Sequence, residues 1–319
     1  MRKQSRMNFR AMRPMFAVSF NNQDMIMISK WIRRSTLALA GAAIVSAPAL
    51  ADPSIWRISD ADSEIFLFGT VHILRDDVEW QSDDVMAAFE ASDTIYFEAP
   101  VNDPEQAAGM VSLIQRFGLN APGSPLSSQL SDEGNALLAR IAPQVGLSAP
   151  LMEPYRPWLA SITMTVQYIS AQGYDPTSGV EAILWPMANE AGKELAYFET
   201  IEEQLGFFGN LPQEIEVQML EQSLEQFEET TGMLDGLVTA WANGDQETID
   251  QLMNGDFREG SPEVYDVIIV QRNERWVDDI VALLDGSGTV FVAVGAGHLP
   301  GEAGVVNLLR ERGIEVESR

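Results

Sequence analysis

Short apolar runs bounded by Gly, Pro or acidic residues predict the strands of a sheet. Four of these runs are rich in Ile, Val, Phe and Tyr, a composition typical of buried or half-buried strands. They lie at Ile65–Phe68, Thr94–Phe97, Glu194–Phe198 and Val290–Val294. A fifth run, at Ile314–Glu317, predicts an edge strand.

Apolar residues at helical spacing predict helices between and after these strands. The predicted helices span Pro104–Phe117, Asp132–Val145, Pro157–Gln172, Val180–Ala191 and Val305–Arg312. From Pro212 to Trp241, one apolar stripe marks an acidic helix or a pair of helices divided at Gly232. From Pro262 to Leu284, a further helical pattern leads through a Gly-rich turn into the Val290 strand.

This order of elements predicts an α/β fold with a central mixed β-sheet flanked by helices. A long acidic all-helical insertion, about residues 103–253, is expected between the N-terminal and C-terminal portions of the sheet. Residues 52–319 have enough apolar content for one domain that includes this insertion.

The first 51 residues predict a secretory signal peptide that is cleaved after Ala51. They combine a basic flank, an apolar run at Thr36–Val45 and a small-X-small cleavage motif. Residues 1–26 are a candidate over-extended start, because Met25 or Met27 also suits as the first residue. The apolar run is shorter than the roughly 20 residues of a spanning helix. We therefore expect a periplasmic or secreted protein with no stable membrane anchor after cleavage.

The absence of Cys excludes disulfides, thiolate metal ligands and a cysteine nucleophile. Residues 52–319 carry 12 Lys and Arg against 46 Asp and Glu, so their formal net charge is −34. Such a surface repels nucleic acid and anionic lipid, and no nucleic-acid partner is expected. Between Lys193 and Arg258 there are 15 acidic residues and no basic one. This run is typical of a solvated helical face or of a surface that attracts cations or basic peptides.

The two His residues of the chain each close a Gly-X-X-His pattern that follows an apolar run. The patterns are Gly69-Thr70-Val71-His72 and Gly295-Ala296-Gly297-His298. Glycine lets the backbone bend sharply and lets a ligand approach closely, so α/β folds place chemistry at such strand ends. A single His there is usually a hydrogen-bonded structural residue. Two matching contexts instead favour one shared functional site.

Two carboxylates also end apolar runs. Glu98 follows Thr94–Phe97, and Glu199 follows Leu195-Ala196-Tyr197-Phe198. A buried ionised carboxylate is costly unless it is paired or bound to a metal, so both are candidates for the same site. For Glu199 the alternative is a cap on the N–H groups of the helix that follows.

Imidazoles and carboxylates from different strand ends suit a divalent cation such as Zn, Mn, Co or Fe. Such an ion can lower the pKa of a bound water and so supply a nucleophile for hydrolysis. Arg272 and Asn273 are candidates to stabilise a developing oxyanion or to hold a substrate carboxylate, because functional cations are scarce in so acidic a chain. The alternative for both is surface pairing with nearby acids.

These residues resemble the TraB/GumN family of the Tiki-like superfamily over nearly all of residues 52–319. The similarity rests on the segments Phe66–His72, Glu98, Gly179-Val180-Glu181, Ala191-Gly192-Lys193, Glu199-Thr200, Arg272-Asn273, Trp276 and Val292–Leu299. The resemblance implies an α/β core with a helical insertion and paired Gly-X-X-His motifs at a metal-dependent active site. In the Tiki branch it implies a membrane-tethered peptidase that cleaves secreted peptide signals.

By that resemblance, His72, Glu98 and His298 would be metal ligands or the general base, with Arg272 and Asn273 in the same site. The family often has Asp where Glu181 stands, and no transmembrane segment follows the signal peptide here. Other branches are linked to pheromone shutdown, and related esterases use a histidine base without metal.

The sequence therefore predicts a metal-dependent hydrolase, first of all a peptidase. The cation held by His72, Glu98 and His298, which would be Mn, Co or Zn, would activate water, and Glu199 would support it as ligand or base. One alternative is a non-enzymatic periplasmic protein that binds or sequesters a peptide or small ligand through the acidic insertion. Another is a metal-free esterase with His72 or His298 as its base. The expected partner is a peptide or small-molecule substrate.

Overall fold

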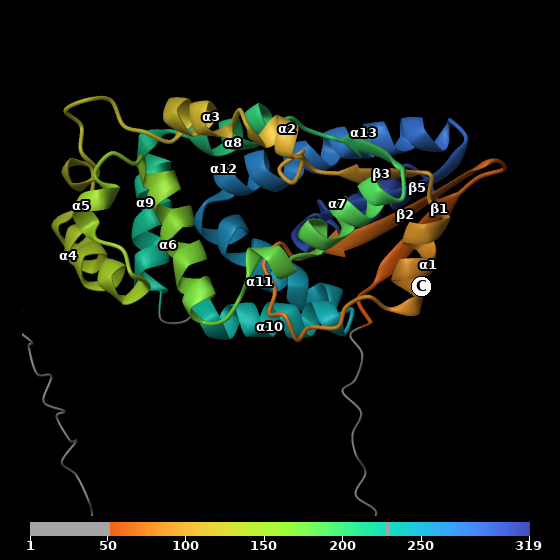
Figure 1. Ribbon diagram of the computed structural model, residues 1–319, viewed down its shortest axis with the longest axis horizontal. Coiled ribbons are helices and arrows are strands. Elements are labelled where there is room, and N and C mark those ends of the chain that lie inside the picture. Colours follow the sequence, from red (N-terminus) through yellow and green to blue (C-terminus); the bar gives the residue numbers. More distant parts are fainter. Residues whose placement is uncertain (1–51, 228–229) are drawn as a thin grey trace, which may run out of the picture. The chain divides into compact units, whose positions relative to one another are not determined.

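The computed structural model describes residues 52–227 and 230–319 and contains one six-stranded sheet, which lies on the right in Figure 1. Its strand order is β4-β3-β5-β2-β1-β6. The strands are β1 (Ile55–Ser59), β2 (Ser63–Thr70), β3 (Thr94–Phe97), β4 (Glu194–Tyr197), β5 (Gly288–Gly295) and β6 (Glu317–Ser318). Neighbours among β4, β3, β5 and β2 are parallel, whereas β1 is antiparallel to both β2 and β6. The predicted mixed α/β fold is confirmed.

Helices surround this sheet and form most of the middle of the chain. Those before β4 are α1 (Asp83–Ala91), α2 (Pro104–Ala107), α3 (Met110–Phe117), α4 (Asp132–Ile141), α5 (Ala149–Met152), α6 (Pro157–Ala171) and α7 (Val180–Glu190). Those after it are α8 (Ile201–Gly209), α9 (Gln213–Glu225), α10 (Thr230–Ala242), α11 (Gln246–Gly260), α12 (Pro262–Tyr265), a π-helical turn (Asp266–Val270), α13 (Gln271–Leu284) and α14 (Val305–Glu311).

The apolar pattern located β2, β3, β4 and β5 to within two residues at each end. The expected insertion is not all-helical, however, because β4 lies inside it and joins the sheet beside β3, as the apolar run there predicted. The edge strand predicted at Ile314–Glu317 is wrong in position, since β6 occupies only Glu317–Ser318. Strand β1 and the helices α1 and α11 were not predicted. The apolar stripe from Pro212 to Trp241 divides between α9 and α10, before Gly232.

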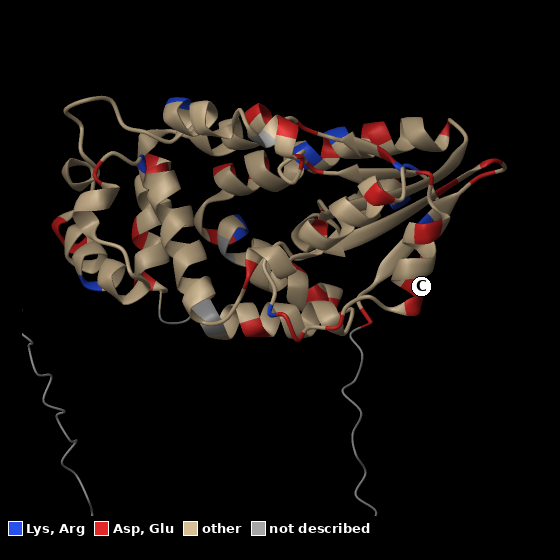
Figure 2. Cartoon of the chain, in the orientation of Figure 1, with Lys and Arg blue, Asp and Glu red and all other residues tan. Residues whose placement is uncertain are grey.

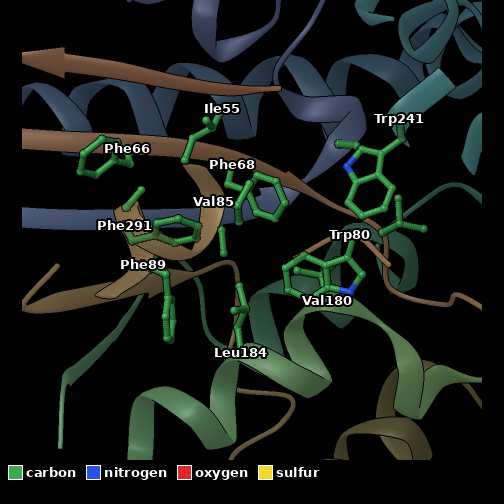
Figure 3. Close-up of a cluster of buried hydrophobic side chains, with 14 of the residues drawn as sticks. Ile55, Phe66, Phe68, Trp80, Val85, Phe89, Val180, Leu184, Trp241 and Phe291 are labelled. Atoms are coloured by element: carbon green, nitrogen blue, oxygen red, sulfur yellow. The ribbon is translucent and has the colours of Figure 1, made fainter. Parts of the chain in front are cut away.

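Two apolar cores cover the two faces of the sheet, because successive side chains of a strand point to opposite faces. On one face, Phe68 and Phe291 pack against α1, α7 and side chains of α10 and α11 (Figure 3). On the other face, Leu67 and Val292 pack against α13 and α14. The sheet is therefore the middle layer of three.

A third core lies within the helical middle of the chain and is built by α4, α6 and α9. Its fully buried side chains include Leu138, Met164, Leu220 and Leu224. The apolar stripe is thus divided between two cores, since α9 packs here while Trp241 of α10 packs against the sheet. Helix α6, which also forms one wall of the candidate site, is held by this core.

Acidic residues are not confined to the helical middle. Asp and Glu also occur on α1, on α13 and around the β1–β2 end of the sheet (Figure 2). Within the acidic run, Glu216 is fully buried and forms an ion pair with Arg156, whose Nε lies 3.2 Å from Glu216 Oε2. That carboxylate serves packing and is not part of a solvated face.

The described residues belong to one compact unit, Ala49–Arg319, and none of their helices has the length and apolarity needed to cross a bilayer. The predicted signal peptide and the alternative start lie outside the described residues. Both stay predictions, as does the domain boundary at residue 52.

The indole of Trp241 ties α10 to the end of β2, which gives a stability prediction. Its Nε1 donates to the carbonyl of Gly69 over 2.7 Å, at a buried position. We expect Trp241→Phe to lower the free energy of unfolding by about 1–3 kcal/mol more than the lost ring volume does, because the Gly69 carbonyl loses its buried partner. The matched control is Trp276→Phe: Trp276 is equally buried, and its Nε1 has no partner among the described residues. Equal losses for both variants in urea denaturation would contradict this role.

Candidate active site

The carboxyl ends of four parallel strands meet at one edge of the sheet. Thr70 of β2 is paired with Gly295 of β5, and Phe97 of β3 is paired with both Ala293 of β5 and Tyr197 of β4. The two Gly-X-X-His turns and both strand-ending glutamates therefore begin side by side. The prediction that the two His residues follow equivalent strand ends is confirmed.

His298 is buried, and Asn273 of α13 fixes its orientation. Its Nδ1 lies 2.6 Å from Asn273 Oδ1, while Asn273 Nδ2 donates to the carbonyls of His298 and Ala303. Because the amide oxygen can only accept, Nδ1 carries the proton and Nε2 is left as an acceptor. Burial lowers the pKa of His298 to about 3, so the ring is neutral at neutral pH.

Arg272 is the buried cation of the site, and acceptors surround its whole guanidinium group. Nε and Nη2 donate to the two oxygens of Glu199 over 2.8 and 2.9 Å, and Nη2 also donates to Glu98 over 2.7 Å. Nη1 donates to the carbonyl of Ile268 and lies 3.0 Å from Nε2 of His298. A guanidinium has five N–H donors. All five are used by the protein, so Arg272 holds the site together and has no donor left for a substrate.

The carbonyl of Ile268 reaches Arg272 from the π-helical turn that precedes α13. In this turn the N–H of Gln271 bonds to the carbonyl of Asp266, one residue further back than in an α-helix. Such wide turns interrupt the regular hydrogen-bond ladder and occur frequently at functional sites. Here the turn also places Ile268 and Ile269 in the wall of the cavity described below.

Glu98 is held in its ionised form at the centre of the site. Burial alone would raise its pKa, but Arg272, the two imidazoles and the N–H of Gly295 together lower it to about 2. Its Oε1 accepts from that N–H over 2.6 Å, and its Oε2 accepts from Arg272 and from Gln204 of α8. Glu98 therefore lies beside Arg272, Gln204 and Gly295 at this edge of the sheet.

Glu199 is buried below Arg272 and does not cap the following helix. Desolvation raises its pKa, while the hydrogen bonds from Arg272 oppose that rise. The cap of α8 is instead the side chain of Thr200, which forms a capping box with Glu203. Glu199 thus acts on the site through Arg272, and its carboxylate does not line the cavity.

His72 differs from His298 in burial and in partner, although the two motifs match. Its side chain is 64% exposed, and its Nδ1 lies 2.8 Å from Oε1 of Glu181. Thr70 donates its hydroxyl to the same carboxylate oxygen. Attraction to Glu181 raises the pKa of His72 to about 9, an effect that surrounding water screens because the ring is exposed. The pair leaves Nε2 facing the cavity.

Gly179, the residue before α7, allows Glu181 to reach His72. A Cβ atom built on Gly179 would lie 1.9 Å from the carbonyl oxygen of His72, so no other residue fits there. The N–H of Val180 donates to the carbonyl of Val71, which docks the first turn of α7 on the first Gly-X-X-His turn. Glu181 was noted in the sequence without a role, and the Gly-Val-Glu motif is the signal that could have supplied it.

These groups surround one end of a cavity of about 370 Å³. A Cβ atom built on Gly295 would lie 3.1 Å from Glu98 Oε1, 3.6 Å from His72 Nε2 and 3.6 Å from the His298 ring. The missing side chain of Gly295 thus leaves a small space between the three groups. Gln204 and Asn254 also line the cavity, and sequence reasoning named neither of them.

The three residues expected to hold a metal ion do not fit it together in this arrangement. His72 Nε2 and Glu98 Oε1 face the same space, but the lone pair of His298 Nε2 accepts from the cationic Arg272. No group of three or more His, Asp or Glu side chains among the described residues is arranged to hold a metal ion. A third ligand would require Arg272 to release His298.

The fold and this site define a class of α/β protein in which two Gly-X-X-His turns and a Glu–Arg pair share one sheet edge. The model of the TraB/PrgY/gumN family matches residues 54–318, and the chain belongs to that family.

Two curated relatives are similar to this chain over most of their length. The chain is 26% identical to the uncharacterized protein YbaP of Escherichia coli K12, over 81% of this chain and 92% of that one. An uncharacterized protein of Treponema pallidum is 22% identical, with 81% and 80% of the two chains covered. No solved structure matches the chain.

Because every N–H of the Arg272 guanidinium is hydrogen-bonded within the protein, we expect a large loss of stability when Arg272 is replaced. We expect Arg272→Met to lower the free energy of unfolding by about 3–5 kcal/mol, because two buried carboxylates lose their cation. Glu199→Gln in the same chain should recover part of the loss. The control is Arg116→Met at the exposed pair with Glu202, where about 0–1 kcal/mol is expected.

The pH dependence of the free energy of unfolding has a defined sign, which Glu98 sets. Because the folded pKa of Glu98 lies at about 2, below its ordinary value of 4.5, its contribution is present above pH 4.5 and is lost as the pH falls towards 2. Arg272→Met should weaken this acid-dependent loss. A wild-type protein whose stability is unchanged between pH 6 and pH 2 would contradict the assignment.

The close approach at Gly179 predicts that Gly179→Ala displaces α7 from the His72 turn. The new methyl group has no room beside the His72 carbonyl, so we expect a lower melting temperature and a loss of the His72–Glu181 contact. The control is Gly232→Ala in α10, where nothing lies within 4 Å of the added atom. That change should be neutral or should stabilise the helix by up to about 1 kcal/mol. NMR of the His72 ring reports the lost contact, and equal spectra for Gly179→Ala and wild type would contradict it.

Proposed function

We propose that this protein is a hydrolase that cleaves peptide bonds, with His72 as the general base that activates water. The observation that carries the proposal is the orientation of His72. Glu181 binds its Nδ1, so Nε2 faces the space above Gly295, beside Oε1 of Glu98. A carboxylate that holds one ring nitrogen while the other faces the reactants is the arrangement of a histidine base.

The residues at this space supply a complete proton path. A water molecule there can donate one hydrogen to His72 Nε2 and the other to Glu98 while its oxygen attacks a carbonyl carbon. His72 takes the proton as the new C–O bond forms, and returns it to the amine nitrogen as the C–N bond breaks. The carboxylates of Glu181 and Glu98 stabilise the imidazolium between these two steps.

Gln204 is our candidate to stabilise the oxyanion. Its Nε2 gives one hydrogen to Glu98 over 3.0 Å, and within residues 52–227 and 230–319 the second hydrogen has no other acceptor. That donor belongs to a side chain that lines the cavity. A fixed donor aimed at developing negative charge is the usual means of lowering such a barrier.

A peptide suits the surroundings of the site better than a small ester. The cavity shares Phe207 with a neighbouring groove of about 700 Å³ between α3, α8 and α12. A substrate that extends beyond the reacting bond can occupy both. The walls of the groove include Asn210, whose side-chain amide can make polar contacts to a peptide backbone.

The divalent cation stays a prediction beside this mechanism. Metal analysis of the purified protein, with and without the combined changes His72→Ala and His298→Ala, tests it directly. Equal metal content in the two proteins would rule out a cation held by His72 and His298. Esterase-like chemistry without metal would then survive treatment with EDTA.

The proposed base gives a prediction about activity. We expect His72→Ala to lower kcat on peptide substrates by about 10²–10⁴-fold, the usual contribution of a general base. Incubation with a mixed peptide library, with and without Mn, Co or Zn, followed by mass spectrometry, measures the cleavage. The exposed variant Val111→Ala is the control, because Val111 lies outside the site. Peptides that bind but are never cut by the wild type would favour the binding protein instead.

Glu181→Gln tests how His72 is held. The groups that face His72 are Glu181, Glu98 and Arg272, and Glu181 contributes most to its raised pKa. Since the base must be neutral, kcat/KM should rise with pH through that pKa, and loss of the Glu181 charge should move the rise to lower pH. A profile that does not shift would show that Glu181 does not set the state of the base.

A further inference from the structure

The cavity is lined by polar groups at the sheet edge, here called its polar end, and by mostly apolar side chains of the helices, here called its apolar end. His72, Glu98, Arg272 and His298 lie at the polar end. Most other walls are carbon: Ile162 and Trp158 come from α6, Phe207 and Phe208 from α8, and Met253 and Phe257 from α11. The helical middle of the chain thus supplies the apolar end, while the sheet edge supplies the chemistry.

The aromatic side chains of Trp158, Phe207 and Phe208 are held in place by their other contacts. The rings of Trp158 and Phe208 stack with their centroids 5.7 Å apart. The one polar atom of Trp158, its Nε1, donates to the carbonyl of Phe117 over 2.9 Å. Phe207 lies against the guanidinium groups of both Arg272 and Arg275, 5.1 and 5.6 Å from its ring centre. A ligand group that enters this end therefore meets carbon surfaces held in place by their other contacts.

Charge attraction does not supply the binding energy at this end. The guanidinium of Arg272 is saturated by Glu98, Glu199, His298 and Ile268, and its flat face is covered by Phe207. Burial of apolar surface is the remaining source, and it is roughly proportional to the area removed from water. The volume of about 370 Å³ lies near the lower limit of about 300–1,000 Å³ for ligand cavities, which suits one large side chain.

Ile162 marks the mouth of the apolar end. It lines the cavity and still keeps 37% of its surface exposed, as one of the few large exposed apolar residues of the described chain. A substrate side chain that enters would cover it. Ile162 lies on α6, whereas His72, Glu98 and His298 follow strands of the sheet, so a change at Ile162 can alter selection while those groups stay in place.

We propose that this cavity is a specificity pocket for a large aromatic or aliphatic side chain next to the peptide bond that is cleaved. The proposal rests on the proposed hydrolase function, because the selected residue is defined by its distance from His72 and Glu98. The substrates are therefore peptides with Phe, Tyr, Trp, Leu or Met beside the cleaved bond. The pocket excludes charged side chains because they would lose their water without gaining a partner.

Ile162→Glu tests the pocket, with Val111→Glu as the matched control. Val111 is also an apolar residue on a helix surface, 66% exposed, and it does not line the cavity. A peptide library read by mass spectrometry should show large apolar residues beside the cut, preferred by the wild type about tenfold or more over Gly and Asp. Ile162→Glu should lose at least that factor in kcat/KM, mainly through KM, and should accept Lys or Arg there. Val111→Glu should keep the wild-type pattern.

A binding measurement separates failure of this proposal from failure of the hydrolase function. Calorimetry with two blocked tripeptides, one with Phe and one with Gly at the centre, requires no cleavage. Suppose that the wild type cuts nothing but binds the Phe peptide about tenfold more tightly than the Gly peptide, and that Ile162→Glu loses that difference. The specificity pocket is then supported, and the proposed hydrolase function is contradicted. The pocket is overturned if cleavage shows no preference for apolar residues, if Ile162→Glu leaves the preference unchanged, or if the wild type binds both tripeptides equally.

Discussion

The buried guanidinium of Arg272 is the contact on which the arrangement of the site depends. It joins three elements, since Glu98 ends β3, Glu199 ends β4 and His298 follows β5. Without this cation, two carboxylates with little access to water would lie at neighbouring strand ends and repel each other. With it, Glu98 stays ionised and turns Oε1 towards Gly295 and His72. The same contact takes the lone pair of His298, which decides which imidazole remains free for chemistry.

The two Gly-X-X-His motifs look equivalent in the sequence but have opposite properties in the fold. His72 is exposed, is held by a carboxylate and has a raised pKa. His298 is buried, is held by an amide and has a lowered pKa. Environments that push two similar groups apart in this way usually mark a division of roles. The carboxylate partner of His72 favours the protonated form of its ring, whereas His298 is a neutral acceptor that helps to fix Arg272.

Much of the fold and the membership of the site could be predicted from the sequence because both depend on local patterns. The apolar runs gave the central strands, and the residues that end them gave His72, Glu98, Glu199 and His298. What the patterns could not give were partners far apart in the chain. The saturation of Arg272 depends on a π-helical carbonyl as well as on two strands, and the role of Glu181 depends on a close approach at Gly179. Strand β1 was missed because Arg57 interrupts its apolar residues; Arg57 pairs with Glu64 on the neighbouring strand.

The helical middle of the chain connects the chemistry to selectivity. Its own core of α4, α6 and α9 is separate from the two cores of the sheet, so α6 can present Trp158 and Ile162 to the cavity without support from the strands. Helices α8 and α11 complete the wall, and α8 also brings Gln204 to Glu98. Substitutions on these helices can therefore reshape the apolar end while the sheet edge keeps Arg272 and both His residues in place. On the proposed function, a fixed sheet edge with a separately stabilised wall would allow one mechanism to serve different substrates.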